Sequence, residues 1–186
     1  MFVEQGYSAT TFAQIATHAG VAVQTVYFHF QNKRTVLAGV VDMAAVGDDE
    51  PVALLDRPWV AQMRSAPDAG RAVAIWCEQS AAIFARVTPI LRIVRDAATT
   101  DPDMAAQWHI NQQQRRAAHS MLAKHLADRD ALRPDITVEH ATDVLYALIS
   151  LELYVLLTTD CGWTPDRWQE WTAKAAHNAV VRSVRD

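Results

Sequence analysis

The stretch that decides the fold begins at Thr11 and reads Thr11-Phe-Ala-Gln-Ile-Ala-Thr-His-Ala-Gly-Val-Ala-Val-Gln-Thr-Val-Tyr-Phe-His-Phe30. Thr11 and Gln14 have the Thr-x-x-Gln spacing of a capping box, in which each side chain binds the other residue's backbone N–H at the start of a helix. Gly20 predicts the end of that helix, because glycine adopts the left-handed conformation without steric cost. A second short helix is expected from Val23 to Phe30. The stretch therefore predicts two helices joined by a tight turn, which is a helix-turn-helix.

Apolar residues fall on one face of each predicted helix. In the first helix that face is made by Phe12, Ile15, Ala16 and Ala19, and in the second by Val26 and Phe30, which are four residues apart. The remaining residues of the second helix lie wholly or partly outside this inward face, so they are available to a partner. Asn32 is the expected N-cap of a third helix, Lys33 to Val46.

Composition favours one class of fold. The chain has 186 residues, of which 51% are apolar, and it contains no β-branched runs with a period of two. We therefore predict an all-α protein. The two cysteines, Cys77 and Cys161, lack metal-ligand spacing and are expected to be buried or semi-buried free thiols in a reducing compartment. No apolar run approaches the length of a membrane span and no signal peptide is recognisable, so we expect a cytoplasmic protein with no membrane partner.

The rest of the chain reads as further helices separated by breaks. Gly47 to Pro51 marks a linker between a helix-turn-helix domain at residues 1–46, with its connecting helix, and a helical domain at 47–186. In that second domain we expect a short segment and then five helices, at 58–63, 69–87, 90–97 (begun by Pro89), 102–127, 138–158 and 166–184. The helix from Val138 is apolar nearly all round, which is typical of an oligomer interface.

Residues in and around the opening stretch carry a family resemblance. They are Gly6-Tyr7, Ala9-Thr10-Thr11, Ile15-Ala16, Ala19-Gly20-Val21, Thr25-Val26-Tyr27-Phe28-His29-Phe30 and Asn32-Lys33. At these positions the chain resembles the DNA-binding signature of TetR-type (tetracycline-repressor-like) transcriptional regulators. A less specific resemblance, to the regulatory domain of many family members, runs from Asp130 to Trp168. The resemblance therefore extends over nearly the whole chain.

The resemblance implies a DNA-binding surface on the second helix. It places Thr25, Tyr27 and Lys33 at phosphate-contacting positions with Thr11 near the backbone, and Val23 and Gln24 at base-contacting positions. Glutamine suits the N6 and N7 edge of adenine, and valine can contact a thymine methyl group. We add His29 to this DNA-binding set. The alternative is that Tyr27 and His29 pack within a three-helix core. Ala22 departs from the family pattern, in which a serine or threonine often caps the recognition helix.

The resemblance also implies a homodimer, double-stranded DNA as a partner and a small-molecule effector, with the last two long helices pairing across a two-fold axis. For the dimer interface we predict Leu145, Leu148, Ile149, Leu153, Leu156, Trp168, Trp171 and Ala175. Aromatic walls with a few polar groups suit an effector pocket, and the candidates are Trp76, Phe84, Trp108, His109, Gln112, Gln113 and Arg116. For the aromatic members, a role in the core is the simpler interpretation.

No pattern indicates catalysis or a cofactor. None of the seven histidines forms an i, i+4 pair with a second ligand group, and no Gly-rich phosphate loop, nucleophile elbow or Cys-His pattern occurs. We therefore expect no enzyme activity, no metal and no cofactor.

Two features favour a different interpretation. Most of the family's first helix is missing before Gly6, and the first 46 residues set Lys33 and Arg34 against Glu4 and Asp42, where DNA-binding modules usually show a basic surface. The alternative function is a helical ligand-binding or scaffold dimer that has lost DNA binding. The preferred function is a ligand-responsive repressor that binds a palindromic operator as a dimer.

Overall fold

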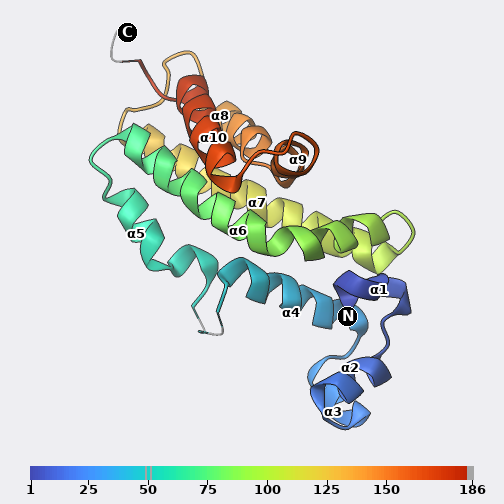
Figure 1. Cartoon of the computed structure of the whole chain (residues 1–186). Helices are drawn as coiled ribbons and strands as arrows, with labels where there is room; N and C mark the ends of the chain where they lie inside the picture. Colours follow the sequence, from blue (N-terminus) through green and yellow to red (C-terminus); the bar gives the residue numbers. More distant parts are fainter. Residues whose placement is uncertain (49, 51, 184–186) are drawn as a thin grey trace. The chain divides into compact units, whose positions relative to one another are not determined.

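The computed structural model describes residues 1–48, 50 and 52–183. Those residues form helices with no β-strand among them, which confirms the predicted all-α class (Figure 1). Asp49 and Pro51 of the predicted linker, and Val184 at the predicted end of the last helix, lie outside the described residues. The chain divides into two compact units, and the division falls inside two long helices. The first unit comprises Met1–Asp49 and Arg86–Gln112, and the second comprises Glu50–Ala85 and Gln113–Asp186. The predicted domain boundary after residue 46 stays a prediction.

The first unit begins with four helices, α1 (Phe2–Ala9), α2 (Phe12–Ala19), α3 (Val23–His29) and α4 (Lys33–Val46). Gly6 interrupts α1 with φ 82° and ψ 171°, a conformation open to glycine and strained for other residues. The buried residues of these helices are Phe2, Tyr7, Phe12, Ala16, Val26, Val36, Leu37 and Val41. The inward faces predicted for α2 and α3 are therefore confirmed at Phe12, Ala16 and Val26, while Ile15 and Phe30 are half-buried. The prediction is wrong for Ala19, which is exposed at the end of α2.

The end of α4 is held by an arginine. Arg86 donates from Nε to the carbonyl of Ala44 at 2.9 Å and from Nη2 to the carbonyl of Ala45 at 2.8 Å. These are carbonyls that the last turn of a helix leaves without an intrahelical partner. Gly47, with φ 91°, ends the helix, and a Cβ atom there would lie 2.9 Å from Nε of Arg86. The positive φ favours glycine at this position, and any other side chain would also displace the Arg86 guanidinium.

The second unit contains the remaining helices. They are η1 (Leu54–Asp56), α5 (Pro58–Arg64), the first part of α6 (Ala69–Ala97), the second part of α7 (Pro102–Asp128), α8 (Val138–Leu148), α9 (Leu151–Val155), η2 (Leu156–Asp160) and α10 (Pro165–Val180). Its core includes an aromatic cluster in which the ring centroids of Phe84, Tyr154 and Trp168 lie 5.1–5.7 Å apart. Such edge-on and tilted pairs are a favourable geometry for aromatic rings.

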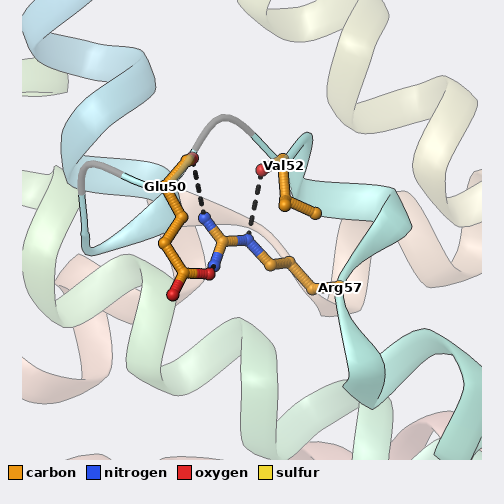
Figure 2. Close-up of polar contacts among 3 residues, drawn as sticks. All are labelled: Glu50, Val52 and Arg57. Carbon is orange, nitrogen blue, oxygen red and sulfur yellow. Dashed lines mark hydrogen bonds and ion pairs between the residues drawn. The ribbon is translucent and has the colours of Figure 1, made fainter.

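Arg57 contacts Glu50 and Val52, which precede it in the connection to α5 (Figure 2). The guanidinium donates from Nε to the carbonyl of Val52 at 3.1 Å and from Nη2 to the carbonyl of Glu50 at 3.3 Å. Its Nη1 also lies 3.2 Å from Oε2 of Glu50. One side chain thus binds two backbone carbonyls and a carboxylate immediately before Pro58, which begins α5.

The prediction of separate helices at 69–87 and 90–97 is wrong. Helix α6 is continuous from Ala69 to Ala97 with Pro89 inside it. A proline inside a helix removes one backbone hydrogen bond and costs about 3 kcal/mol. Here Pro89 itself is exposed, whereas Ile90, Leu91 and Val94 are buried. We infer that burial of these three side chains offsets the cost of the proline, since burying a leucine or isoleucine contributes about 1.5–3 kcal/mol.

The single helix predicted from Val138 to Thr158 is also wrong. The predicted cap is confirmed, because the Thr137 hydroxyl accepts a hydrogen bond from the N–H of His140. The helix then stops at Ile149, where φ is −99° and ψ is 58°, and Ser150 caps the new helix α9 by accepting from the N–H of Leu153 at 3.1 Å. The last turns are a π-helix rather than an α-helix. A serine inside an apolar run was the signal for this break, because serine is a preferred N-cap residue.

A buried histidine lies beside this break. His119 is 4% exposed and accepts a hydrogen bond on Nδ1 from Nε1 of Trp76 at 3.2 Å. Burial and the nearby Arg115 lower the pKa of His119 to about 4, although a hydrogen bond with the backbone of Ile149 acts in the opposite direction. The imidazole is therefore neutral at pH 7. It connects α6, α7 and the non-helical residue between α8 and α9, so the break has a polar partner in the core.

Two further expectations need correction. Among the described residues, Val138–Asp160 is long and apolar enough by composition to cross a membrane, with a mean hydropathy of 1.5, so an apolar run of that length does occur. This is weak evidence for a span, because the core helix of a soluble protein meets the same test. Leu145, Leu151 and Tyr154 of this segment are buried in the second unit. Cys77 is buried as expected, but Cys161 is exposed.

Candidate DNA-binding surface

Helices α2 and α3 form the predicted helix-turn-helix. Thr11 and Gln14 make both hydrogen bonds of the capping box, at 2.8 Å and 3.2 Å. Gly20 ends α2 in the left-handed conformation with φ 68°, as predicted. The predicted departure at Ala22 is also present, since this residue precedes α3 without a side-chain cap. Helix α3 is therefore placed by the turn and by packing on α2 rather than by its own cap.

Most of the residues predicted to bind DNA lie on the outside of the first unit. Gln24, Thr25, Tyr27 and His29 are exposed, and Val23 is half-buried. The ring of Tyr27 is 58% exposed, yet it also packs edge-on against the buried ring of Phe12, with centroids 4.5 Å apart. The alternative that His29 and Tyr27 belong to the core therefore fails for His29 and holds only for one face of Tyr27. Their contacts with DNA stay a prediction.

Thr11 and Lys33 have partners inside the protein. The hydroxyl of Thr11 is engaged in the capping box. The ammonium of Lys33 donates to the carbonyl of Tyr7 at 2.6 Å and to that of Ser8 at 3.3 Å, and it lies 4.3 Å from the centroid of the Tyr7 ring. Lys33 thus binds the last turn of α1 and joins it to the start of α4. Lysine has three N–H donors, so one remains for a phosphate.

Replacing Lys33 by methionine should lower the stability of the first unit. The change removes two charge-assisted hydrogen bonds and a cation–π contact but keeps most of the aliphatic stem, and we expect a loss of about 1 kcal/mol after allowing for solvent screening. Thermal unfolding followed by far-UV circular dichroism measures this loss, with Lys174→Met, on the exposed side of α10, as the control. An unchanged melting temperature, together with a weaker salt dependence of DNA binding, would assign Lys33 to a phosphate instead.

Phe28 is the residue of this surface that the sequence interpretation left out. Its side chain is 84% exposed, the largest value among the exposed apolar residues of the described chain, and its ring lies 5.2 Å from that of His29. A signal was present in the sequence. Phe28 is two residues from both Val26 and Phe30, so it points away from the inward face of a helix. A bare aromatic ring beside Gln24 and Thr25 is suited to apolar contact with base edges.

The predicted effector residues fall into different environments. Trp76 and Phe84 are buried in the core of the second unit, where each contacts other aromatic rings. Arg116 is exposed and forms an ion pair with Asp143 at 2.7 Å. Trp108, His109 and Gln112 belong to the first unit, and Gln113 to the second. The proposal that these seven residues contact a ligand stays a prediction, and Trp76 and Phe84 have the core role that was the alternative.

Arg115 has features of a ligand contact that the sequence interpretation missed. Its Nη2 lies 3.4 Å from Oε2 of Glu152, and its guanidinium lies 5.0 Å from the ring centroid of Tyr146. Its Nε and Nη1 atoms are buried and have no hydrogen-bond partner among the residues that the structure describes. Buried donors without partners are uncommon, and a guanidinium with open donors is suited to a carboxylate.

Three of the predicted interface residues need correction. Leu145, Ile149 and Trp168 have no exposed surface in the second unit, so they belong to its core and cannot contact a partner. Leu148, Leu153 and Ala175 are half-buried. Leu156 is 48% exposed and Trp171 is 41% exposed. The latter five residues remain as the predicted interface.

These features define a class of protein. Two short helices joined by a glycine turn, with polar and aromatic residues exposed on the second, are the architecture of a helix-turn-helix DNA-binding protein. Residues 1–40 match the family model described as bacterial regulatory proteins, tetR family. Residues 1–40 are therefore a TetR-family DNA-binding domain, and the chain as a whole has the fold of TetR-family transcriptional regulators.

Solved structures share this fold along nearly the whole chain. NalD of Pseudomonas aeruginosa, described as the secondary repressor of the MexAB-OprM multidrug efflux pump, is 26% identical with a TM-score of 0.69, over 98% of this chain and 90% of NalD. The SmeT–triclosan complex is 18% identical with a TM-score of 0.73, over 98% and 87%. A Saccharomonospora viridis protein described as a transcriptional regulator, in complex with choline, is 17% identical with a TM-score of 0.69, over 98% and 92%. The comparison with curated proteins gave no significant match.

Proposed function

We propose that the protein is a transcriptional repressor that binds a palindromic operator as a homodimer and releases it when a small molecule binds the helical domain. The observation that carries this proposal is the exposed face of α3, where Gln24, Thr25 and Phe28 stand clear of the core. A helix of this kind enters the major groove, and a dimer presents two of them about 34–36 Å apart on successive turns of DNA. Such a repressor acts in the cytoplasm, where the DNA is.

Exposed apolar residues near the end of the chain support the dimer. Leu156 and Trp171 are large apolar side chains with more than a third of their surface exposed, and Leu148 and Leu153 are partly exposed. Homodimer interfaces are more apolar than the rest of a protein's surface and are enriched in aromatic residues. A second copy of the chain bound there by the same residues gives a two-fold symmetric dimer.

Ligand response is supported by the relatives and by one residue of the second unit. The solved complexes of similar proteins contain triclosan and choline. In this chain Arg115 offers buried donors without a partner among the described residues. A ligand acts as an inducer only if it binds the form with low operator affinity more tightly than the form with high affinity. We therefore expect an effector to lower operator affinity, rather than only to bind.

Selection of duplex DNA from a random library, followed by fluorescence anisotropy, tests the proposal. We expect a palindromic site, binding with a stoichiometry of one dimer per site, and a molecular mass in solution of two chains. Gln24→Ala should relax the base preference at one position of each half-site and weaken binding by about 1–3 kcal/mol. Failure to bind any duplex above the non-specific level at low salt would reject the repressor and favour the ligand-binding or scaffold dimer.

A further inference from the structure

A cavity of about 450 Å³ lies in the second unit, between the end of α5 and the second half of α7. Arg64 lines it from α5, and Ala117, Met121, Lys124, His125 and Asp128 line it from α7. The α7 residues follow the i, i+4, i+7 spacing of a single helical face. The volume is within the range of small-molecule sites. This cavity involves none of the residues predicted to contact an effector.

The residues that line the cavity carry more positive than negative charge. The side chains of Arg64 and Lys124 are both exposed, and neither forms an ion pair within residues 1–48, 50 and 52–183. Nη2 of Arg64 instead lies 3.4 Å from the sulfur of Met121. Asp128 is the single acid of the lining, so the cavity carries a net positive charge. Both cations, of which only Arg64 has a weak contact with sulfur, are available to an anionic group.

His125 adds a buried polar atom to this wall. Its Nε2 is buried and has no hydrogen-bond partner in the described part of the chain. Burial lowers the pKa of His125, and the charges of Arg129 and Arg64 lower it further, so the imidazole is neutral at pH 7. A neutral imidazole that places its proton on Nε2 is a hydrogen-bond donor. A polar atom left open in this way is uncommon and indicates a missing partner.

The segment that follows Arg64 is held against the end of α7 by hydrogen bonds. Arg129, which follows α7 directly, donates from Nη1 to the carbonyl of Ala66 at 2.6 Å and from Nη2 to the carbonyl of Pro67 at 3.2 Å. These contacts hold the turn after α5 against the end of α7. The two walls of the cavity are therefore preorganised, which reduces the entropy lost when a ligand binds.

We propose that this cavity binds a small organic anion. Arg64 and Lys124 bind the anionic group, and Ala117 and Met121 contact the apolar body of the ligand. The proposal rests on the chemistry of this cavity alone, so its test does not depend on whether the protein binds DNA. A carboxylate and a phosphate monoester share the chemistry that these residues recognise.

Isothermal titration calorimetry of the full chain with three probes that share a phenyl ring tests the proposal. The probes are benzoate, phenyl phosphate and benzyl alcohol. We expect one anion per chain to bind, with benzyl alcohol at least about tenfold weaker, because the neutral probe forms no charge-assisted hydrogen bond. The anion that binds more tightly identifies the headgroup. Arg64→Gln and Lys124→Gln should each weaken anion binding about tenfold, and added salt should weaken it as well.

Two further variants decide between this cavity and general surface charge. Lys174→Gln removes the same charge from α10 in the same unit and should leave anion binding unchanged. Ala117→Trp fills the cavity without altering its charge and should abolish binding, with circular dichroism confirming that the variant is folded. Absence of binding by both anions overturns the proposal. Equal binding of benzyl alcohol, an equal loss in Lys174→Gln, or full binding by Ala117→Trp overturns it too.

Discussion

Trp168→Ala should lower the melting temperature by about 10 °C. Trp168 is fully buried and packs its ring against those of Phe84 and Tyr154, with centroids 5.7 Å and 5.1 Å away. Truncating a buried tryptophan to alanine costs about 3–5 kcal/mol, because the transfer free energy is lost and a cavity is left. For a chain of this size, 1 kcal/mol corresponds to about 2–4 °C. Thermal unfolding monitored by far-UV circular dichroism measures the shift.

Trp168→Phe is the matched control for this prediction. The indole Nε1 is buried and has no hydrogen-bond partner among the described residues, so its N–H contributes no stabilising bond to be lost. Phenylalanine keeps an aromatic ring in contact with Phe84 and Tyr154. We therefore expect less than half of the alanine effect, on the order of 1 kcal/mol. Equal shifts for the two variants would contradict the prediction, because they would show that the ring contacts kept by phenylalanine do not stabilise this cluster.

Helix ends were the part of the fold that the sequence predicted well. Thr11, Gly20, Asn32 and Thr137 cap or end helices as predicted. These residues act on backbone groups within one helical turn of themselves, so the information needed is local. The same reasoning applied to Pro89 gave a wrong helix start. The helix continues through that proline because neighbouring residues are buried by segments distant in sequence, and spacing does not reveal burial.

The break between α8 and α9 shows the same limit. Ser150 is a local cap signal, but it lies in an apolar run whose period is that of one long helix. His119, which hydrogen-bonds the backbone of Ile149, is thirty positions earlier in the chain. A short window of sequence of the kind used to predict helix ends therefore does not contain both residues. The wrong prediction of buried residues for the dimer interface has a related cause. An all-round apolar helix predicts burial on several sides without showing which side faces the core of its own chain.

The residues of the candidate sites were likewise only partly predictable from the sequence. The exposed positions of α3 follow from helical geometry, and Phe28 could have been included on that basis. The contacts of Lys33 could not, because the carbonyl of Tyr7 is 26 residues away in the chain. Arg115 and His125 are also invisible to spacing, since their significance lies in buried nitrogen atoms without partners among the described residues.

Phe28→Ala should weaken binding of the operator selected under the proposed function by about 10- to 100-fold while leaving the melting temperature unchanged. The side chain is 84% exposed in the free protein, so its removal costs little folding free energy. If α3 enters the major groove, that ring becomes buried against base edges and sugar atoms. Burying a phenylalanine contributes about 1.5–3 kcal/mol, which corresponds to this range of affinity. Fluorescence anisotropy with the selected duplex measures the change.

Met43→Ala is the matched control, because Met43 is another exposed apolar residue of the first unit, 62% exposed on α4 rather than on α3. It should alter neither DNA affinity nor stability. A thymine methyl group is the apolar feature of the major groove, so replacing thymine by uracil at the contacted position should weaken the wild type and have no effect on Phe28→Ala. If Phe28→Ala binds the operator as tightly as the wild type, then α3 does not present this face to the DNA, and the docking of the recognition helix proposed above is wrong.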